Sequence, residues 1–197
     1  MIFQKTLLIA TLSVMATSAH AINFSSTFTG DNYVNNFTYS TIGSATHIDT
    51  TTLSDTQYWP TSSTLNLTLN NATQYDFIWE VQNAGGPSGF LADFTLGTTS
   101  YSTSTDPNIW SYSSDGINWA TVTSYGQHGV APWGNISGIS SNAEWIWDSS
   151  NGLSNETLLF KASITSPIPE PSTYALMLGG LGLIGFMAHR RKRNLPS

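Results

Sequence analysis

The sequence predicts an all-β domain that folds as an antiparallel β-sandwich of jelly-roll or similar topology. Two observations support this prediction: apolar and polar residues alternate over several short segments, and turn-forming residues separate these segments. A third is the abundance of Ser, Thr and Asn between the two chain ends, which disfavours long helices. Such a pattern fits two packed sheets that each bury one face.

Three segments show the alternation most clearly. Leucines alternate with Asn and Thr over 65–70, large apolar residues occupy every second position of 77–81, and the same period recurs over 158–164. We expect these segments to be half-buried strands. The turn signals that separate the expected strands are Asn70–Asn71, the glycine-rich run 83–89, Asp106–Asn108, Asp115–Gly116 and Asn151–Gly152.

The first 21 residues have the pattern of a secretory signal peptide. Lys5 precedes an apolar stretch over 7–15, and the small-residue box Ala19-His20-Ala21 follows it. This order predicts export through the Sec machinery and cleavage by signal peptidase after Ala21. The domain of interest is then 22–166.

The other end of the chain combines an apolar run with a basic cluster. Residues 174–188 are apolar, glycine-rich and without Lys, Arg, Asp or Glu, and Arg190, Arg191, Lys192 and Arg193 follow. A helix over this run would be about 22 Å long, against about 30 Å for the hydrocarbon core of a bilayer, so we expect a short and temporary transmembrane anchor. The basic cluster is predicted to stay in the cytoplasm, which places the preceding domain across the membrane.

The tripeptide Pro169, Glu170 and Pro171 stands directly before this run. The order of tripeptide, apolar run and basic cluster over 167–194 resembles the sorting signal of PEP-CTERM proteins, the substrates of exosortases in Gram-negative bacteria. The resemblance implies that an exosortase in the inner membrane recognises Pro-Glu-Pro, cuts near it, and releases or transfers the domain to the cell surface or extracellular matrix. The alternative is an ordinary membrane anchor behind a stiff proline-rich spacer.

The charge and cysteine content of 22–166 exclude several functions. Eleven of the twelve acidic residues of the chain lie in this region, against the single cation Lys161. Binding to nucleic acid needs clustered Lys and Arg, so we exclude it. The chain has no cysteine, which excludes thiol catalysis, thiolate metal sites and lipidation at a lipobox.

Catalytic patterns are absent from the same region of the sequence. His47 and His128 are its only histidines, and neither belongs to an H-E-x-x-H motif. Ser88 lies in a glycine-rich turn that lacks the G-x-S-x-G pattern. We therefore predict that the protein is not an enzyme.

The alternative to a protein without catalysis is a polysaccharide hydrolase, because a pair of carboxylates could act as its acid and base or nucleophile. Asp76 and Glu80 are four residues apart, as are Glu144 and Asp148. On a strand this spacing is about 13 Å, too far for a retaining glycosidase.

Aromatic side chains are the best candidates for ligand binding, because their flat faces can stack on sugar rings. Trp145 and Trp147 are predicted to share one strand face and, like Trp79, to pack in the core. The loop-like tryptophans are the glycan-binding candidates: Trp59, Trp119 and Trp133.

Two short features add weaker expectations. Asp31 and Asn32 are candidate calcium ligands, since calcium binds loop oxygens, although no EF-hand loop is present and no other cofactor is expected. Segments 29–32, 83–92 and 145–147 look like parts of PEP-CTERM ectodomains that are similar to galactose-binding-like jelly rolls. This second resemblance implies an architecture suited to glycans. The sequence thus predicts an exported surface or matrix protein that associates with exopolysaccharide, or else a hydrolase or a purely structural surface protein.

Overall fold

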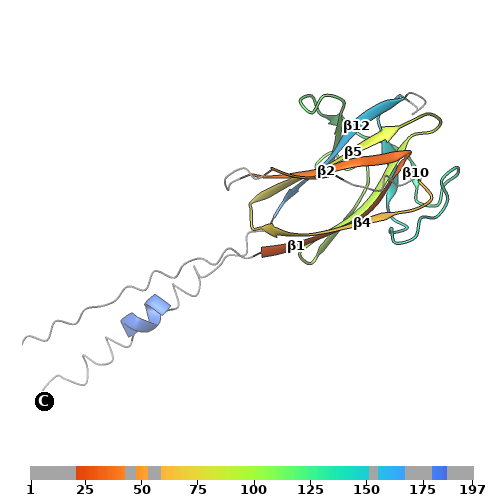
Figure 1. The fold of residues 1–197 in the computed structure, drawn as a ribbon. Helices are drawn as coiled ribbons and strands as arrows, with labels where there is room; N and C mark the ends of the chain where they lie inside the picture. The colour runs from red at the N-terminus through yellow and green to blue at the C-terminus, as the bar shows by residue number, and fades with distance from the viewer. Residues whose placement is uncertain (1–20, 43–47, 53–58, 151–154, 167–178, 186–197) are drawn as a thin grey trace, which may run out of the picture. The chain divides into compact units, whose positions relative to one another are not determined.

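A computed structural model describes residues 21–42, 48–52, 59–150, 155–166 and 179–185. The strands belong to one compact unit that starts at Ala21, and the short helix over 179–185 belongs to a second unit (Figure 1). The predictions for Pro169, Glu170 and Pro171 and for the basic cluster 190–193 fall outside the described residues, as does nearly all of the predicted signal peptide.

The strands form two sheets, and every pairing between the described strands is antiparallel. Sheet A has the order β10 (Thr123–Gln127), β11 (Glu144–Trp147), β6 (Gly89–Leu96), β1 (Ala21–Asp31) and β4 (Ser63–Asn70), with β7 (Thr99–Ser102) also paired to β6. Sheet B has the order β3 (Ile48–Thr52), β2 (Tyr33–Ile42), β5 (Gln74–Asn83), β12 (Glu156–Thr165), β8 (Trp110–Ser113) and β9 (Ala120–Thr121). The prediction of an all-β fold with two antiparallel sheets is confirmed.

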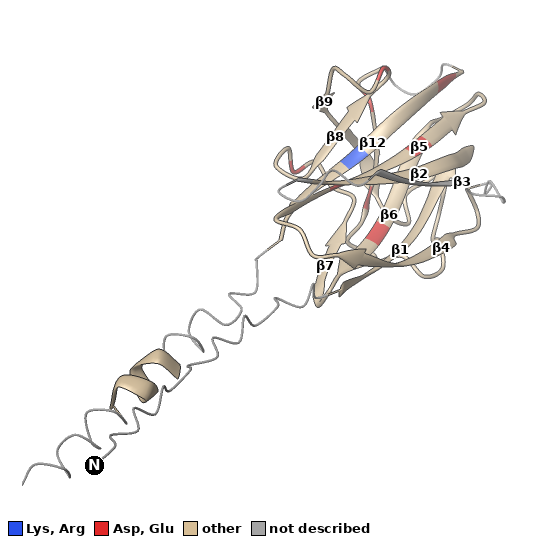
Figure 2. Ribbon diagram, turned by 60° about the vertical axis from the view of Figure 1, so that its left-hand side comes forward, with Lys and Arg blue, Asp and Glu red and all other residues tan. Residues whose placement is uncertain are grey.

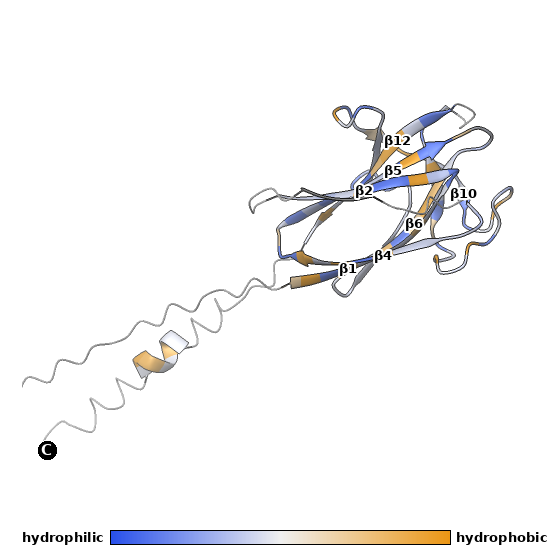
Figure 3. Ribbon diagram, in the orientation of Figure 1, coloured by the Kyte–Doolittle hydropathy of each residue, from blue (hydrophilic) through white to orange (hydrophobic). Residues whose placement is uncertain are grey.

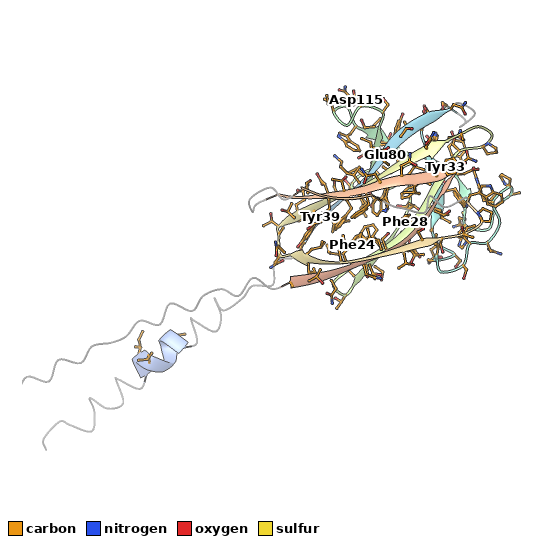
Figure 4. The ribbon with its side chains drawn as sticks, viewed as in Figure 1. Phe24, Phe28, Tyr33, Tyr39, Glu80 and Asp115 are labelled. Atoms are coloured by element: carbon orange, nitrogen blue, oxygen red, sulfur yellow. The ribbon has the colours of Figure 1, made fainter. Side chains whose placement is uncertain are left out.

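The main core fills the space between the two sheets with aromatic rings. Burial alternates along β5, because successive side chains of a strand point to opposite faces. Phe24 of sheet A stacks on Phe77 of sheet B with ring centroids 4.4 Å apart, and Phe90 stacks on Phe160 at 5.1 Å. Each such pair contributes about 0.5–1.5 kcal/mol beyond its buried area. Figure 3 shows the resulting alternation of apolar and polar residues along the strands, and Figure 4 shows Phe24 and Phe28 directed into the interior.

The tryptophans that were predicted to be buried are buried. Trp79, Trp145 and Trp147 are each 0% exposed, which confirms their core packing. The prediction that Trp145 and Trp147 share one strand face is wrong, since Trp147 belongs to the main core and Trp145 to a second cluster. Trp147 is the last residue of β11, where the chain leaves the strand and the alternation ends.

The second cluster contains Leu91 of β6 and Trp145 of β11, both on strands of sheet A. Leu91 lies between Phe90 and Ala92, which face the main core, so this cluster covers the outer face of sheet A. The other members come from the chain between β10 and β11, residues 128–143, which we call the cap. They are Trp133, Ile136, Ile139 and Ala143.

The first and last strands place both ends of the domain at the same pole. Ala21 at the start of β1 pairs with Asn70, and Thr165 at the end of β12 pairs with Gln74. Asn70 and Gln74 flank the short β4–β5 turn, and the Ser166 backbone N–H donates to the carbonyl of Thr73 at 3.0 Å. We call this end the tether pole. Strand β1 has eleven residues and is about 33 Å long. We call the end of the sandwich at which β1 finishes, near Asp31, the distal pole.

The predicted transmembrane helix lies mostly outside the described residues. The part that is described, 179–185, is helical, and Leu181, Leu183 and Ile184 are 57–66% exposed on it. Within the described ranges, no helix combines the length and the hydropathy that a membrane crossing requires.

Candidate functional site

The cap is fastened to sheet A through Trp133 and Asp31. The Trp133 indole Nε1–H donates to Asp31 Oδ2 at 2.7 Å, and the indole stacks on Trp145 with ring centroids 4.6 Å apart. Both partners are buried, with Trp133 5% and Asp31 4% exposed. Burial raises the pKa of Asp31, and the hydrogen bond from Trp133 opposes this effect in part. As placed, Trp133 is therefore a packing residue whose ring is covered.

Asp31 and Asn32, the candidate calcium ligands, both accept hydrogen bonds from other loops. Asn32 Oδ1 accepts the Ala84 backbone N–H at 2.6 Å, while Asp31 holds the indole of Trp133. In the part of the chain that the structure describes, no group of three or more His, Cys, Asp or Glu side chains is arranged to hold a metal ion. Calcium binding stays a prediction, and the geometry gives these two residues a role in joining loops.

His128 organises the cap through both ring nitrogens. Nε2 accepts the Ile136 backbone N–H at 2.5 Å, and Nδ1 lies 3.0 Å from the Ser140 carbonyl oxygen. A ring nitrogen that accepts must be unprotonated, so the geometry assigns the neutral tautomer with the proton on Nδ1. Asp93 Oδ2 accepts the Ser140 backbone N–H. His128 and Asp93 therefore shape the cap.

The carboxylates beneath the cap are not spaced for glycoside hydrolysis with retention. Asp93 on β6 pairs with Thr27 on β1, four residues before Asp31. The strand rise puts about 13 Å between the two backbone positions, against about 5 Å between the carboxyl groups of retaining enzymes. The pair supplies no acid and nucleophile for one sugar bond.

The three glycan-binding candidates do not gather on one surface. Trp59 packs against the second cluster, to which Trp133 belongs, and its carbonyl accepts the Thr29 hydroxyl at 3.3 Å. Trp119 lies beside sheet B, where the Lys161 ammonium group is 4.0 Å from the centre of its ring. Figure 2 shows this cation on β12. The proposed glycan role of these tryptophans stays a prediction.

The loop before Trp119 is organised by Asp115, which Figure 4 places at its tip. Asp115 Oδ1 accepts the backbone N–H groups of Ile117 and Asn118, both at 2.8 Å, and the hydroxyl of Ser113 at 2.9 Å. These hydrogen bonds favour the charged form and hold the pKa of Asp115 well below its usual range. Asp115 is thus a turn residue.

Comparison with protein families gives one match. Residues 167–192 match the family model described as the PEP-CTERM protein-sorting motif. The chain carries a PEP-CTERM sorting motif. The matched range contains Pro169, Glu170 and Pro171 and most of the basic cluster, and it supports the predicted processing by an exosortase. Neither the curated proteins nor the solved structures gave a match.

The PEP-CTERM motif begins directly after Ser166 at the tether pole, and a polar hollow opens at the distal pole. This hollow has a volume of about 280 Å³ and is lined by Gln82, Asn83, Ala84, Asn155, Glu156 and Thr157. Sequence reasoning did not find it, because two segments more than 70 residues apart form it through the β5–β12 register. The glycine-rich run 83–89 was predicted as a turn and as part of the segment 83–92 that resembles PEP-CTERM ectodomains, but not as a wall of a hollow.

Proposed function

We propose that this protein is exported, held briefly in the inner membrane by its C-terminal segment, and sorted by an exosortase to the surface or extracellular matrix of a Gram-negative bacterium. There it associates with exopolysaccharide and does not turn it over. The match of 167–192 to the PEP-CTERM sorting motif is the observation that carries the proposal. The basic residues Arg190, Arg191, Lys192 and Arg193 would keep the end of the chain in the cytoplasm until processing.

The positions of the strands are compatible with processing at both ends. Cleavage after Ala21 would remove one residue of β1, whose pairing with β4 continues from Ile22 to Phe28. A cut near Pro169 would leave β12 intact, since this strand ends at Thr165. Neither cut touches the main core, so the released domain would keep its fold.

The hydrogen bonds of Asp31, Asp115 and His128 support a role without catalysis for these three residues. Asp31 and Asp115 are occupied by loop contacts, and both nitrogens of His128 have backbone partners. A general acid or base must reach a substrate proton, which these groups do not do as placed. A polysaccharide hydrolase and a surface protein without a specific ligand remain the alternatives.

The sorting step is tested by Glu170→Gln in the full chain, with Glu80→Gln on β5 as the matched control. Cells expressing the parent should release the domain from the inner membrane, and the Glu170 variant should stay there at its unprocessed mass. The control should behave like the parent. Equal mass and location of the Glu170 variant and the parent would contradict sorting through the tripeptide.

A further inference from the structure

We infer that the hollow at the distal pole is a binding site for a neutral saccharide segment. This inference rests on the proposed function, because it names the ligand class of a domain proposed to meet exopolysaccharide. The hollow lies at the end of the sandwich opposite Ala21 and Thr165, from which the predicted membrane segments extend along the chain. Within the domain, this pole is therefore the end away from Ala21 and Thr165, the strand residues nearest to those segments in the sequence.

The walls of the hollow are held in place by the strand register and by Asn83. Gln82 pairs with Thr157 and Asn83 with Glu156, which brings β5 and β12 side by side at their ends. The Asn83 amide Nδ2–H donates to Ser88 Oγ at 3.0 Å, and Asn83 Oδ1 accepts the Gly85 backbone N–H at 2.9 Å. The site is therefore largely formed before a ligand binds, which lowers the entropic cost of binding.

The other side of the hollow is fixed by contacts to neighbouring loops. The Ala84 backbone N–H donates to Asn32 Oδ1, and Glu156 Oε1 accepts the Trp147 indole N–H at 2.8 Å. Gly85 has φ +128°, and a Cβ added there would lie 3.5 Å from Asn155 Oδ1. The 83–89 loop thus passes close to the Asn155 side chain, which lines the same hollow.

An exposed aromatic ring stands beside the hollow. Tyr33 pairs directly with Gln82, which in turn pairs with Thr157, and residues directly opposite in antiparallel strands share a face. Tyr33, Gln82 and Thr157 therefore form one row across β2, β5 and β12. The Tyr33 side chain is 36% exposed, and Figure 4 shows it at the end of the sandwich away from the start of β1.

This row has the chemistry that a sugar requires. An aromatic face packs against the C–H side of a sugar ring, and amide, hydroxyl and carboxylate groups pair with its hydroxyls. Asn35 Nδ2 donates to Gln82 Oε1 at 3.1 Å, which orients the Gln82 amide with its N–H groups available as donors. Thr157 can donate and accept, and the Glu156 carboxylate, which lines the hollow beside this row, can accept.

The charge of the hollow selects against acidic ligands. Among its lining residues Glu156 is the one that ionises, and none of them is a cation. Lys161 lies four residues beyond Thr157 on β12, about 13 Å along the strand, where it faces Trp119. An anionic polysaccharide would meet a carboxylate without a compensating positive charge, so the ligand is neutral.

A second hollow provides an internal control. It has a volume of about 310 Å³ and lies at β1 and β4, lined by Asn23, Phe24, Ser25, Asn66, Leu67 and Thr68. Phe24 is 1% exposed and belongs to the main core, so its ring offers no face to a ligand there. Asn66 is an exposed amide that matches Gln82 in chemistry, and Ile117, which is 79% exposed, matches Tyr33 as an exposed apolar side chain.

The test is affinity electrophoresis of the purified full chain in detergent, in gels that contain dextran, laminarin or galactomannan as neutral probes and alginate as the acidic probe. We expect retardation by at least one neutral polysaccharide and none by alginate. Tyr33→Ala and Gln82→Ala should each weaken the retardation about tenfold, the size expected for a lost stacking contact or hydrogen bond in a binding site. Asn66→Ala and Ile117→Ala should leave it unchanged.

Three results would overturn the inference: retardation by none of the neutral probes, retardation by alginate alone, or equal effects of the site and control variants. Circular dichroism of each variant checks that the sheets are intact. The assay uses purified protein and does not depend on sorting. A failure here leaves the exosortase proposal standing, and a failure of the Glu170 experiment leaves the binding result standing.

Discussion

The two poles of the sandwich are built in different ways. At the tether pole, short turns close the strands, and the backbone pairs of Ala21 and Thr165 with the residues around the β4–β5 turn complete the sheets. Tyr75 reinforces this turn: its hydroxyl donates to the Asn70 carbonyl at 2.7 Å and accepts the Ala72 N–H at 2.9 Å. At the distal pole, loops are joined by side chains from distant parts of the sequence, as in the bond between Asp31 and Trp133.

The difference fits the roles proposed for the two ends, tethering at one pole and ligand binding at the other. Regular pairing at the tether pole suits the proposed cleavage on both sides of a domain that stays folded. Loops at the distal pole can vary in sequence while the sheets hold their positions, which is how binding surfaces are commonly built. Substitutions at Tyr75 and at Trp133 and Asp31 test whether the tether pole and the distal pole depend on the contacts assigned to them.

The largest effect is expected for Trp133→Ala. The change removes a buried indole from the second cluster and deprives Asp31 of its hydrogen-bond donor. We expect unfolding in urea to show a loss of about 3–5 kcal/mol. Trp119→Ala, at a partly exposed position, is the control and should cost much less. Equal losses would contradict the buried role of Trp133.

The contact between Trp133 and Asp31 also shows which features the sequence could predict and which it could not. The strands at 65–70, 77–81 and 158–164 and the burial of Trp79 followed from alternation, because a period of two reports the face of a strand directly. The cap has no such period, so its folding over sheet A was missed. Trp133 looked like a loop tryptophan open to a ligand, and only its contacts with Asp31 and Trp145 show that its ring is covered.

The distal hollow was beyond sequence reasoning for a related reason. It depends on which residue of β5 lies opposite which residue of β12, and on the pairing of Tyr33 with Gln82. The pairing register depends on how whole sheets pack, so it cannot be predicted from any one segment of the sequence. The sorting motif, in contrast, is a contiguous signal, and it was predicted from its order alone.

A smaller effect is expected for Tyr75→Phe at the tether pole. The ring stays in the core, but the Asn70 carbonyl and the Ala72 N–H lose their shared partner. We expect a loss of about 2 kcal/mol in urea unfolding, because a buried group without a partner costs about 1–3 kcal/mol. Tyr101→Phe on β7 is the control. An unchanged stability of the Tyr75 variant would show that the turn holds without its hydroxyl.

Substitution of Asp31 should change the free energy of unfolding by a smaller amount, and the change should depend on pH. Because the pKa of Asp31 is raised above the ordinary value of 3.8, the folded state holds this proton more tightly than the unfolded state. The contribution of Asp31 to stability therefore falls as pH rises from 3.8 through the folded-state pKa. Asp31→Asn keeps an acceptor for Trp133. We expect this variant to lose the pH dependence of stability that Asp31 causes, and to be at least as stable as the unmodified protein at neutral pH.

Asp31→Ala is the matched comparison for the charge effect. It removes the acceptor as well as the charge, so it should lose about 1–3 kcal/mol at neutral pH. Urea unfolding at several pH values measures both variants. An equal loss in the Asn and Ala variants would show that the hydrogen bond with Trp133 contributes nothing.

The smallest effect is expected for Asp115→Ala in the exposed loop before Trp119. The lowered pKa of Asp115 means that its stabilising bonds are complete above pH 3.8 and are lost as the pH falls below that value. In the variant, the N–H groups of Ile117 and Asn118 lose their acceptor. Trp119 fluorescence should shift, while the urea midpoint changes little. A large drop of the midpoint would contradict the local role of this loop.

Processing at both ends is tested most directly by the covalent form of the protein at its final location. Peptide mapping by mass spectrometry of the protein recovered from the cell surface and matrix should find the domain from Ile22 onward and no peptide from 174–197. That result would establish processing at both sides of an intact sandwich. Recovery of the chain with its end at Ser197 would contradict sorting by an exosortase and would favour a permanent anchor.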